Sequence, residues 1–387
     1  MKNIIIIGSR GYKSEYGGWE TFVTNLIDNY NDSDTKFYIP ELSHEKTDKV
    51  HMEGNVECVP ITVKPMGSIT MMNFAFKAVM YYKKRIKKEH MQNVVMYILG
   101  CRVGPLFSLI HKCLNKMGVV IMINPDGLEW KREKWNFLIK QYFKLSERTM
   151  IKSANYVICD SSAILNYVKE KYQKYDVNAR FIAYGAYLKS DKELLPKTQK
   201  YMEKFDIRKK DYYLFVGRFV PENNIELIIK EFMKTNIQSD LVIISNVEEN
   251  SFYEKLVQDT HFLEDKRIKF VGSLYDDEVL RQIRKNAIAY IHGHSAGGTN
   301  PSLLEALSIT NVNILYDVVY NREVGSNAVL YFNKNEDNLK NILEQVSNFR
   351  DKDIENYGKF AKERIQNAYT WDIVVSKYKK LFEEILK

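Results

Sequence analysis

The sequence is short of cysteine and of long apolar runs, and each shortage excludes a class of protein. Its four cysteines, Cys58, Cys101, Cys113 and Cys159, are scattered and form no C-x-x-C pair. We therefore expect reduced core residues of a cytosolic protein, and neither a disulfide framework nor a zinc site. No apolar stretch approaches the roughly 18 residues that a membrane span needs. The isoleucine run at 4–7 is too short for the core of a signal peptide.

The common glycine fingerprints of nucleotide-binding proteins are also missing. A β-branched run at residues 3–7 predicts a buried parallel strand, and a glycine-containing loop follows it. Gly8, Gly11, Gly17 and Gly18 do not match G-x-G-x-x-G, and there is no Walker lysine. This pattern argues against a nicotinamide dehydrogenase. Gly17 and Gly18 still permit close backbone approach to a bound group.

What the sequence does contain is a regular alternation of strand-like and helical patterns. A chain of 387 residues predicts two domains, and its 45% hydrophobic content can fill two cores. The alternation predicts an α/β fold with parallel sheets covered by helices. A polar stretch at residues 189–200 is the expected linker. The later buried strands are expected at residues 94–99, 119–123, 156–159, 213–216, 241–244, 268–271 and 287–291.

The most informative segment covers residues 292–307. Its small-residue loop leads into a helix that Asn300 can cap, and Pro301 fits the first helical position. The loop amides and the positive end of the helix form a cradle suited to phosphate. Glu305 lies one turn along the helix, where a carboxylate can accept hydrogen bonds from ribose hydroxyls. The segment therefore predicts a site for a nucleotide diphosphate.

A second diphosphate ligand is expected in the loop that follows the strand at 213–216. Arg218 comes directly after this strand and Gly217, just before a helix. A guanidinium there can hold a diphosphate with two parallel hydrogen bonds.

Arg218 and Glu305 together resemble the retaining glycosyltransferases of family four, which have the GT-B fold. The N-terminal half resembles a bacterial subfamily that includes streptococcal-type rhamnosyltransferases. The matching motifs are Gly8–Gly11, Tyr16–Thr21, Asp126–Arg132, Cys159–Ser161 and Tyr184–Ala186.

The resemblance implies two Rossmann-like, doubly wound domains that face a cleft. The acceptor-side domain is expected over residues 1–190 and the nucleotide-sugar domain over residues 191–369. The final helix, residues 370–387, is expected to pack, with a return to the N-terminal domain as one arrangement.

The resemblance also implies site residues, three of which (Asp126, Arg218 and Glu305) are expected to be catalytic. Asp126, Glu129 and Trp130 are expected on the acceptor side. The donor-binding set is Gly17, Gly18, Arg218, Asn223, Gly272, Leu274, His294, Gly297, Gly298, Thr299, Asn300 and Glu305.

Three positions depart from the family pattern. Gly297 stands where the family has the first of two glutamates, and Asn223 stands near the place of a lysine. Asp126 replaces a histidine that contacts the transferred sugar in the family, which fits either a different sugar or a plain turn aspartate. The missing glutamate and lysine leave open a non-catalytic partner subunit.

We expect transfer of L-rhamnose from dTDP-L-rhamnose to a lipid-diphosphate-linked saccharide in capsule or cell-wall polysaccharide synthesis. The leaving phosphate would take the acceptor proton in a front-face displacement, with Asp126 as base or nucleophile in the competing mechanism. A UDP-sugar-dependent glucosyl- or N-acetylglucosaminyltransferase is the alternative within the same class.

No cofactor or metal is expected. The D-x-D of residues 32–34 lies in a polar turn, and we expect His292 and His294 to point to opposite faces of a strand, which argues against a zinc pair.

The formal net charge is +8, and two helical segments, 74–90 and 131–152, are rich in lysine and arginine; the second is interleaved with aromatic residues. Either these helices address an anionic membrane surface at the inner face of the bacterial plasma membrane, or they present solvated lysines over a packed stripe. Nucleic-acid binding is disfavoured because no binding motif accompanies the charge.

Overall fold

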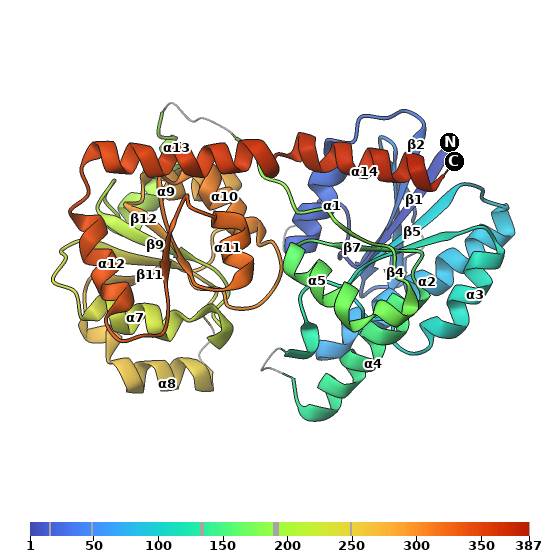
Figure 1. Cartoon of the computed structure of the whole chain (residues 1–387), viewed down its shortest axis with the longest axis horizontal. Coiled ribbons are helices and arrows are strands. Elements are labelled where there is room, and N and C mark those ends of the chain that lie inside the picture. The colour runs from blue at the N-terminus through green and yellow to red at the C-terminus, as the bar shows by residue number, and fades with distance from the viewer. Residues whose placement is uncertain (15–16, 48, 132–134, 189–192, 248–249, 387) are drawn as a thin grey trace. The chain divides into compact units, whose positions relative to one another are not determined.

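The computed structural model describes residues 1–14, 17–47, 49–131, 135–188, 193–247 and 250–386. It divides the chain into two compact units, Met1–Tyr184 with Trp371–Lys387, and Gly185–Thr370. The expected boundary at 190/191 falls outside the described residues, as do Tyr16 and Arg132 of the matching motifs. Figure 1 shows the elements of both units.

Unit 1 begins with β1 (Lys2–Ile7), α1 (Gly18–Asp28) and the strands β2 (Thr35–Ser43), β3 (His51–Glu53) and β4 (Val56–Thr62). It continues with α2 (Thr70–Glu89), β5 (Val94–Leu99), α3 (Phe107–Lys116), β6 (Val120–Asn124), α4 (Phe137–Ser153), β7 (Tyr156–Cys159), α5 (Ser162–Lys171), β8 (Ala179–Phe181) and the C-terminal α14 (Trp371–Ile385).

The sheet of unit 1 has the strand order β3-β4-β2-β1-β5-β6-β7-β8. All its neighbours run parallel except the edge pair β3 and β4. All six residues of β5 are buried, and since neighbouring side chains on a strand point to opposite faces, both faces of the sheet are covered. The predicted buried strands are thus confirmed for this unit.

Helix α14 packs in unit 1, which is the return to the N-terminal domain that the resemblance allowed. The Tyr378 hydroxyl lies 2.9 Å from that of Tyr97 on β5, and the Tyr378 ring lies 5.8 Å from that of Phe22 on α1. Trp371, at the start of the helix, is also buried. The predicted packing role of this helix is confirmed.

Unit 2 contains α6 (Pro196–Lys204), β9 (Tyr212–Val216), α7 (Ile225–Met233), β10 (Asp240–Ile244), α8 (Ser251–Thr260), β11 (Ile268–Phe270), α9 (Asp277–Asn286) and β12 (Ala289–His292). It ends with α10 (Pro301–Ile309), β13 (Val312–Tyr316), α11 (Val319–Gly325), β14 (Leu330–Phe332), α12 (Asn338–Ser347) and α13 (Asp351–Ala368).

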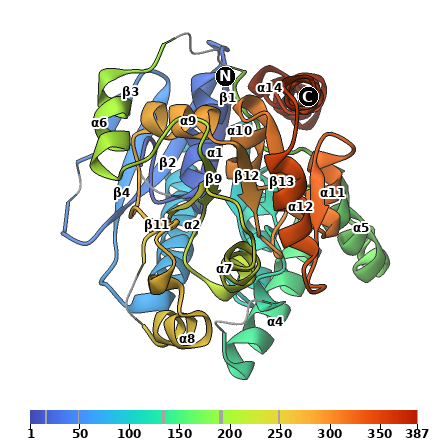
Figure 2. The same cartoon turned by 90° about the vertical axis from the view of Figure 1, so that its left-hand side faces the viewer.

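The six strands of unit 2 are all parallel, in the order β11-β10-β9-β12-β13-β14. In Figure 2, β12 is seen between β9 and β13. The chain order passes from β9 outwards to β11 and then returns to β12, so the winding reverses between β9 and β12. Such a switch point is where ligands bind in doubly wound sheets.

The expected linker at 189–200 is wrong in part. Residues 189–192 lie outside the described part, but α6 already starts at Pro196, because proline is favoured in the first turn of a helix. The preceding backbone is also fixed: the Leu195 N–H donates to the side chain of Gln282, and Gln282 donates back to the Glu193 carbonyl.

Candidate functional site

The candidate donor site lies at the carboxyl edge of the sheet in unit 2. Because β9 and β12 are parallel neighbours, the loop that holds Arg218 and the loop that holds His294 leave the same edge. The two loops are joined directly. The Asn224 side chain donates to the Gly293 carbonyl at 2.7 Å, and the Ser295 N–H and hydroxyl both donate to the Glu222 carbonyl.

Gly293 is what permits this close approach. A Cβ at this position would lie 2.1 Å from the carbonyl oxygen of Asn223, which is far inside van der Waals contact. Only glycine lets the two loops pair at this distance.

Helix α10 begins as the sequence predicts. Asn300 accepts a hydrogen bond from the Ser302 N–H at 2.9 Å, and Pro301 occupies the first turn. Gly297 in the preceding loop has φ 128°, which favours glycine. Thr299 is buried beside Gly298. The small-residue loop thus leads into a capped helix N-terminus, an arrangement that commonly binds anions.

Glu305 is held by a buried arginine that the sequence did not single out. Arg284 of α9 donates through Nη1 to Glu305 at 2.5 Å and through Nη2 to the Ser302 hydroxyl at 2.8 Å. Ser302 is also 3.2 Å from the Tyr290 hydroxyl. The side chain of Arg284 is only 4% exposed, whereas that of Glu305 is 42% exposed. The carboxylate is therefore anchored at one oxygen while the side chain still reaches solvent.

The prediction that His292 and His294 point to opposite faces is wrong. Their rings stack with centroids 4.1 Å apart and planes 9° apart. The reason is the period of a strand: residues i and i+2 share a face, and only successive residues alternate. Tyr290, two residues earlier, follows the same rule, since its hydroxyl lies 3.2 Å from His292 Nδ1.

Both imidazoles are neutral over the physiological range. Burial lowers the pKa of His294 to about 3, and the nearby Arg218 guanidinium adds to this effect. Burial also places the pKa of His292 well below its usual value, with the charges of His294 and Arg284 as smaller causes. Within the described residues, the buried His294 Nδ1 and His292 Nε2 have no hydrogen-bond partner.

Arg218 is exposed at the end of β9, close enough to His294 for its charge to act on that ring. Asn223 is only 3% exposed, and its side chain donates to the Arg218 carbonyl at 2.8 Å. Asn223 therefore braces the loop that carries Arg218, and a direct contact with the donor stays a prediction.

Gly272 and Leu274 follow β11 at the same carboxyl edge. The Gly272 carbonyl accepts from the Ser245 N–H at 3.1 Å, so this loop is tied to the end of β10. Gly272 is exposed and has a positive φ of 74°.

In unit 1, the glycine loop opens helix α1. Gly17 caps the helix with φ 135°, and Gly18 is its first residue. A Cβ at Gly17 would lie 2.0 Å from a carboxylate oxygen of Glu20, whose other oxygen accepts the Arg10 N–H at 2.9 Å. Glu20 is thus buried against the loop after β1, and that explains the need for glycine at position 17.

The three expected acceptor-side residues, Asp126, Glu129 and Trp130, line one small pocket of unit 1. Asp126 has φ 62°, and its N–H donates to the Asn124 side chain at 2.8 Å. Asp126 therefore occupies a turn in the left-handed conformation, which is the alternative to a sugar contact that the sequence left open.

The same pocket contains residues that were not predicted from the sequence. Arg102 follows β5 and stacks over the Trp19 ring at 4.4 Å, and the buried Glu147 of α4 accepts from the Trp130 indole at 3.1 Å. A polar residue just past a predicted strand was the available signal for Arg102. Glu147 had none, because it sits within a basic helical pattern.

The two basic helices differ in what they expose. In α2 the apolar stripe that includes Phe74, Val79 and Tyr82 is buried, so its lysines form a solvated face. In α4, by contrast, Phe137 and Leu138 are 71% and 77% exposed. Lys134, counted in the same basic segment, lies outside the described residues. None of the helices in the described ranges is long and apolar enough to cross a membrane.

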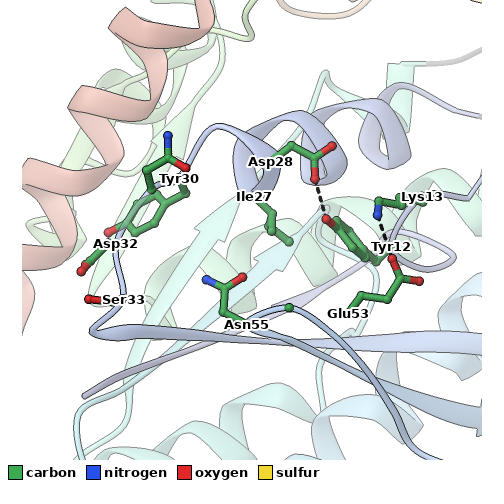
Figure 3. A pocket seen from close by; sticks show the side chains of 11 residues that line it. Tyr12, Lys13, Ile27, Asp28, Tyr30, Asp32, Ser33, Glu53 and Asn55 are labelled. Carbon is green, nitrogen blue, oxygen red and sulfur yellow. Dashed lines mark hydrogen bonds and ion pairs between the residues drawn. The ribbon is translucent and has the colours of Figure 1, made fainter.

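The D-x-D turn lines a different pocket, which contains none of the predicted site residues (Figure 3). Asp32 already accepts hydrogen bonds from the Thr35 hydroxyl, the Asp34 N–H and the Lys2 ammonium. These bonds lower its pKa to about 2. The carboxylate is thus used inside the turn.

Each half of the chain is similar to a different protein family. Residues 197–369 match the family described as glycosyl transferases group 1, and residues 1–187 match a domain of unknown function, DUF1972. An uncharacterised glycosyltransferase from Methanocaldococcus jannaschii is 26% identical over 406 residues, covering all of both chains.

Solved structures agree on the fold. Sucrose-phosphate synthase from Thermosynechococcus elongatus has a TM-score of 0.78 at 15% identity, covering 100% of this chain and 99% of that one. Anabaena HepE, solved in complex with UDP, has a TM-score of 0.72 at 12% identity, covering 99% and 100%. The predicted α/β fold with two Rossmann-like sheets is confirmed, and it is the fold of GT-B glycosyltransferase structures.

Proposed function

We propose that the protein is a glycosyltransferase that moves L-rhamnose, with retention, from dTDP-L-rhamnose to a lipid-diphosphate-linked saccharide in capsule or cell-wall polysaccharide synthesis. One observation supports donor binding above all. Arg218, the stacked histidines and the capped start of α10 all follow the carboxyl ends of the neighbouring strands β9 and β12 in unit 2. Phosphate oxygens would accept from Arg218 and from the amides of Gly298, Thr299 and Asn300.

Glu305 is proposed to accept hydrogen bonds from the sugar of the nucleotide. Its anchoring by Arg284 leaves the second oxygen for this task. The buried Nδ1 of His294, which has no hydrogen-bond partner in the described part of the chain, is proposed to donate to or accept from the transferred sugar or phosphate. We propose that four further residues approach the donor, as the matching positions do in the family that the sequence resembles: Gly17, Gly18, Gly272 and Leu274.

The mechanism proposed is a front-face displacement. Cleavage of the sugar–phosphate bond leaves negative charge on the diphosphate, which Arg218 and the start of α10 would stabilise. The departing phosphate oxygen takes the proton of the acceptor hydroxyl, while Asp126, Glu129 and Trp130 contact the acceptor or the transferred sugar. No metal step is needed, so turnover should be equal with and without added magnesium; strict magnesium dependence would contradict this.

A UDP-sugar is the second candidate donor, favoured by the UDP bound in the Anabaena relative. The deoxyribose of dTDP offers Glu305 only one hydroxyl, whereas the ribose of UDP offers two. A thermal-shift panel of nucleotide sugars separates the candidates, because a ligand at 100 times its Kd stabilises the fold by about 2.7 kcal/mol. We expect the largest shift with dTDP-L-rhamnose, and a larger shift with UDP-glucose or UDP-N-acetylglucosamine would replace the rhamnose assignment.

Transfer by the purified chain separates an enzyme from a sugar-nucleotide-binding partner subunit. Donor hydrolysis or transfer is expected from this chain alone. Donor binding without any turnover would instead favour the non-catalytic subunit.

The acceptor is proposed to be reached at an anionic membrane surface through α4. The exposed Phe137 and Leu138 can enter the headgroup region, while Lys144 and Arg148, on the exposed side of the same helix, meet anionic lipid. Flotation with anionic liposomes at low salt should recover the wild type, and Phe137→Ser/Leu138→Ser should reduce recovery. Equal flotation of wild type and variant, or no binding at all, would remove α4 from this role.

A further inference from the structure

Three potential metal ligands from three different strands meet on one face of the sheet in unit 1. Cys58 of β4 lies opposite both Ile39 of β2 and His51 of β3 in the strand register. Glu41 is two residues beyond Ile39, and residues two apart on a strand share a face. The register alone therefore places Glu41, His51 and Cys58 on the same side of the sheet.

The side chains also converge. The Glu41 carboxylate, the His51 imidazole and the Cys58 thiol have ligand atoms that all lie within 4.8 Å of one another. In a tetrahedral zinc site with bonds of about 2.0–2.3 Å, ligand atoms are roughly 3.3–3.8 Å apart, so contraction by about 1 Å completes the geometry. His51 is 43% exposed, which gives an ion access, whereas Cys58 is buried.

The two ring nitrogens of His51 face two different carboxylates. Its Nδ1 lies 3.9 Å from Glu41, and its Nε2 lies 3.9 Å from the Glu53 carboxylate. One ring nitrogen thus faces the ligand cluster. The other faces the Glu53 carboxylate at a distance longer than a hydrogen bond, from which a small shift would bring Glu53 to the position of an outer partner. Glu53 is in turn held by Lys13 at 2.8 Å, a pair visible in Figure 3.

We propose that Glu41, His51 and Cys58 form a zinc site with an open fourth position for water. A thiolate, an imidazole and a carboxylate together suit zinc, whereas magnesium and calcium prefer oxygen ligands alone. None of these residues has a part in the proposed transfer reaction. The sheet order separates β4 from β6, which precedes Asp126, by β2, β1 and β5. A bound ion would link the three-residue edge strand β3 to β4 and β2.

Cobalt titration of the full-length, metal-stripped protein tests the site without any transferase assay. Wild type is expected to bind one cobalt per chain with a thiolate-to-cobalt absorption band, and zinc is expected to remove that band. Cys58→Ser should lose the band, while Cys113→Ser, at a partly buried cysteine of α3, should keep it.

His51→Gln covers the case in which Cys58→Ser fails to fold, because His51 is exposed. It should keep the thermal melting curve of the metal-free protein and weaken cobalt binding by at least about tenfold, the loss seen when even an outer partner is removed. Three results would each overturn the proposal: no thiolate band with excess cobalt, a band that survives in Cys58→Ser, or cobalt affinity unchanged in His51→Gln.

Discussion

The Arg284 guanidinium and the Glu305 carboxylate form an ion pair at 2.5 Å, in which the arginine is buried and the glutamate reaches solvent. This pair fixes the orientation of the Glu305 carboxylate, to which the proposed nucleotide ligand would bind. Arg284 also donates to Ser302, one turn earlier on the same helix, so a single side chain from α9 locks the first two turns of α10.

Arg284→Lys is expected to weaken donor binding by roughly tenfold, since a lysine ammonium cannot reproduce the forked contact with both Glu305 and Ser302. The effect should appear in the donor Kd measured by calorimetry and in KM, with kcat little changed. Glu305→Gln should not add to it in the double variant, because both changes break one interaction. Additive losses would mean that Arg284 does not act through Glu305.

Arg218→Ala is expected to reduce turnover by about 10²–10³-fold, the loss typical of one preorganised charge-stabilising donor. Arg218 is exposed, so the melting temperature should not change. Arg208→Ala, at an exposed arginine of the same unit, is the matched control and should behave as wild type. Near-normal turnover of Arg218→Ala would refute its role at the diphosphate.

Acid sensitivity should depend on His294. Its pKa is about 3 in the folded protein, against about 6.5 in an unfolded chain, so the unfolded state binds the proton first as the pH falls. The free energy of unfolding should therefore decline from about pH 6.5 down to pH 3, by up to about 1.4 kcal/mol per pH unit for one group. Urea titrations of His294→Gln should show a shallower decline, and an identical pH profile would exclude this histidine as the cause.

Asp126→Asn separates charge from backbone geometry. Because asparagine also adopts the left-handed conformation seen at φ 62°, the turn and the stability should be kept. If Asp126 contacts the sugar, transfer falls by on the order of tenfold or more, as for a lost charged hydrogen bond, and added small anions do not restore it. Rescue by azide or formate would favour a covalent role, and unchanged activity would leave Asp126 as a turn residue.

Gly293→Ala is expected to lower the free energy of unfolding by about 1–3 kcal/mol, since the new methyl group would overlap the Asn223 carbonyl. The separation of the two loops should also weaken donor binding. Ala296→Ser, at an exposed position of the same loop, serves as the control for a general loop effect. A free energy of unfolding equal to that of the wild type in Gly293→Ala would mean that the two loops can move apart without loss of stability.

The sequence indicated the periodic parts of the molecule with good accuracy. Buried β-branched runs gave β1, β5 and β7, and the cap at Asn300 gave the start of α10. These features depend on residues close together in the chain, because helix caps and the spacing of apolar side chains are set by local sequence. The stacking of His292 on His294 also follows from a local rule, because residues two apart on a strand share a face.

Partners distant along the chain were decided by the tertiary structure alone. Arg284 precedes Glu305 by two elements, and neither spacing nor composition marks it as the partner of that carboxylate. Glu41, His51 and Cys58 follow no compact ligand motif, and only the register of β2, β3 and β4 brings them together. The chain itself therefore determined which segments become strands and helices, whereas sheet order and register decided which side chains meet, because those depend on packing between segments far apart in sequence.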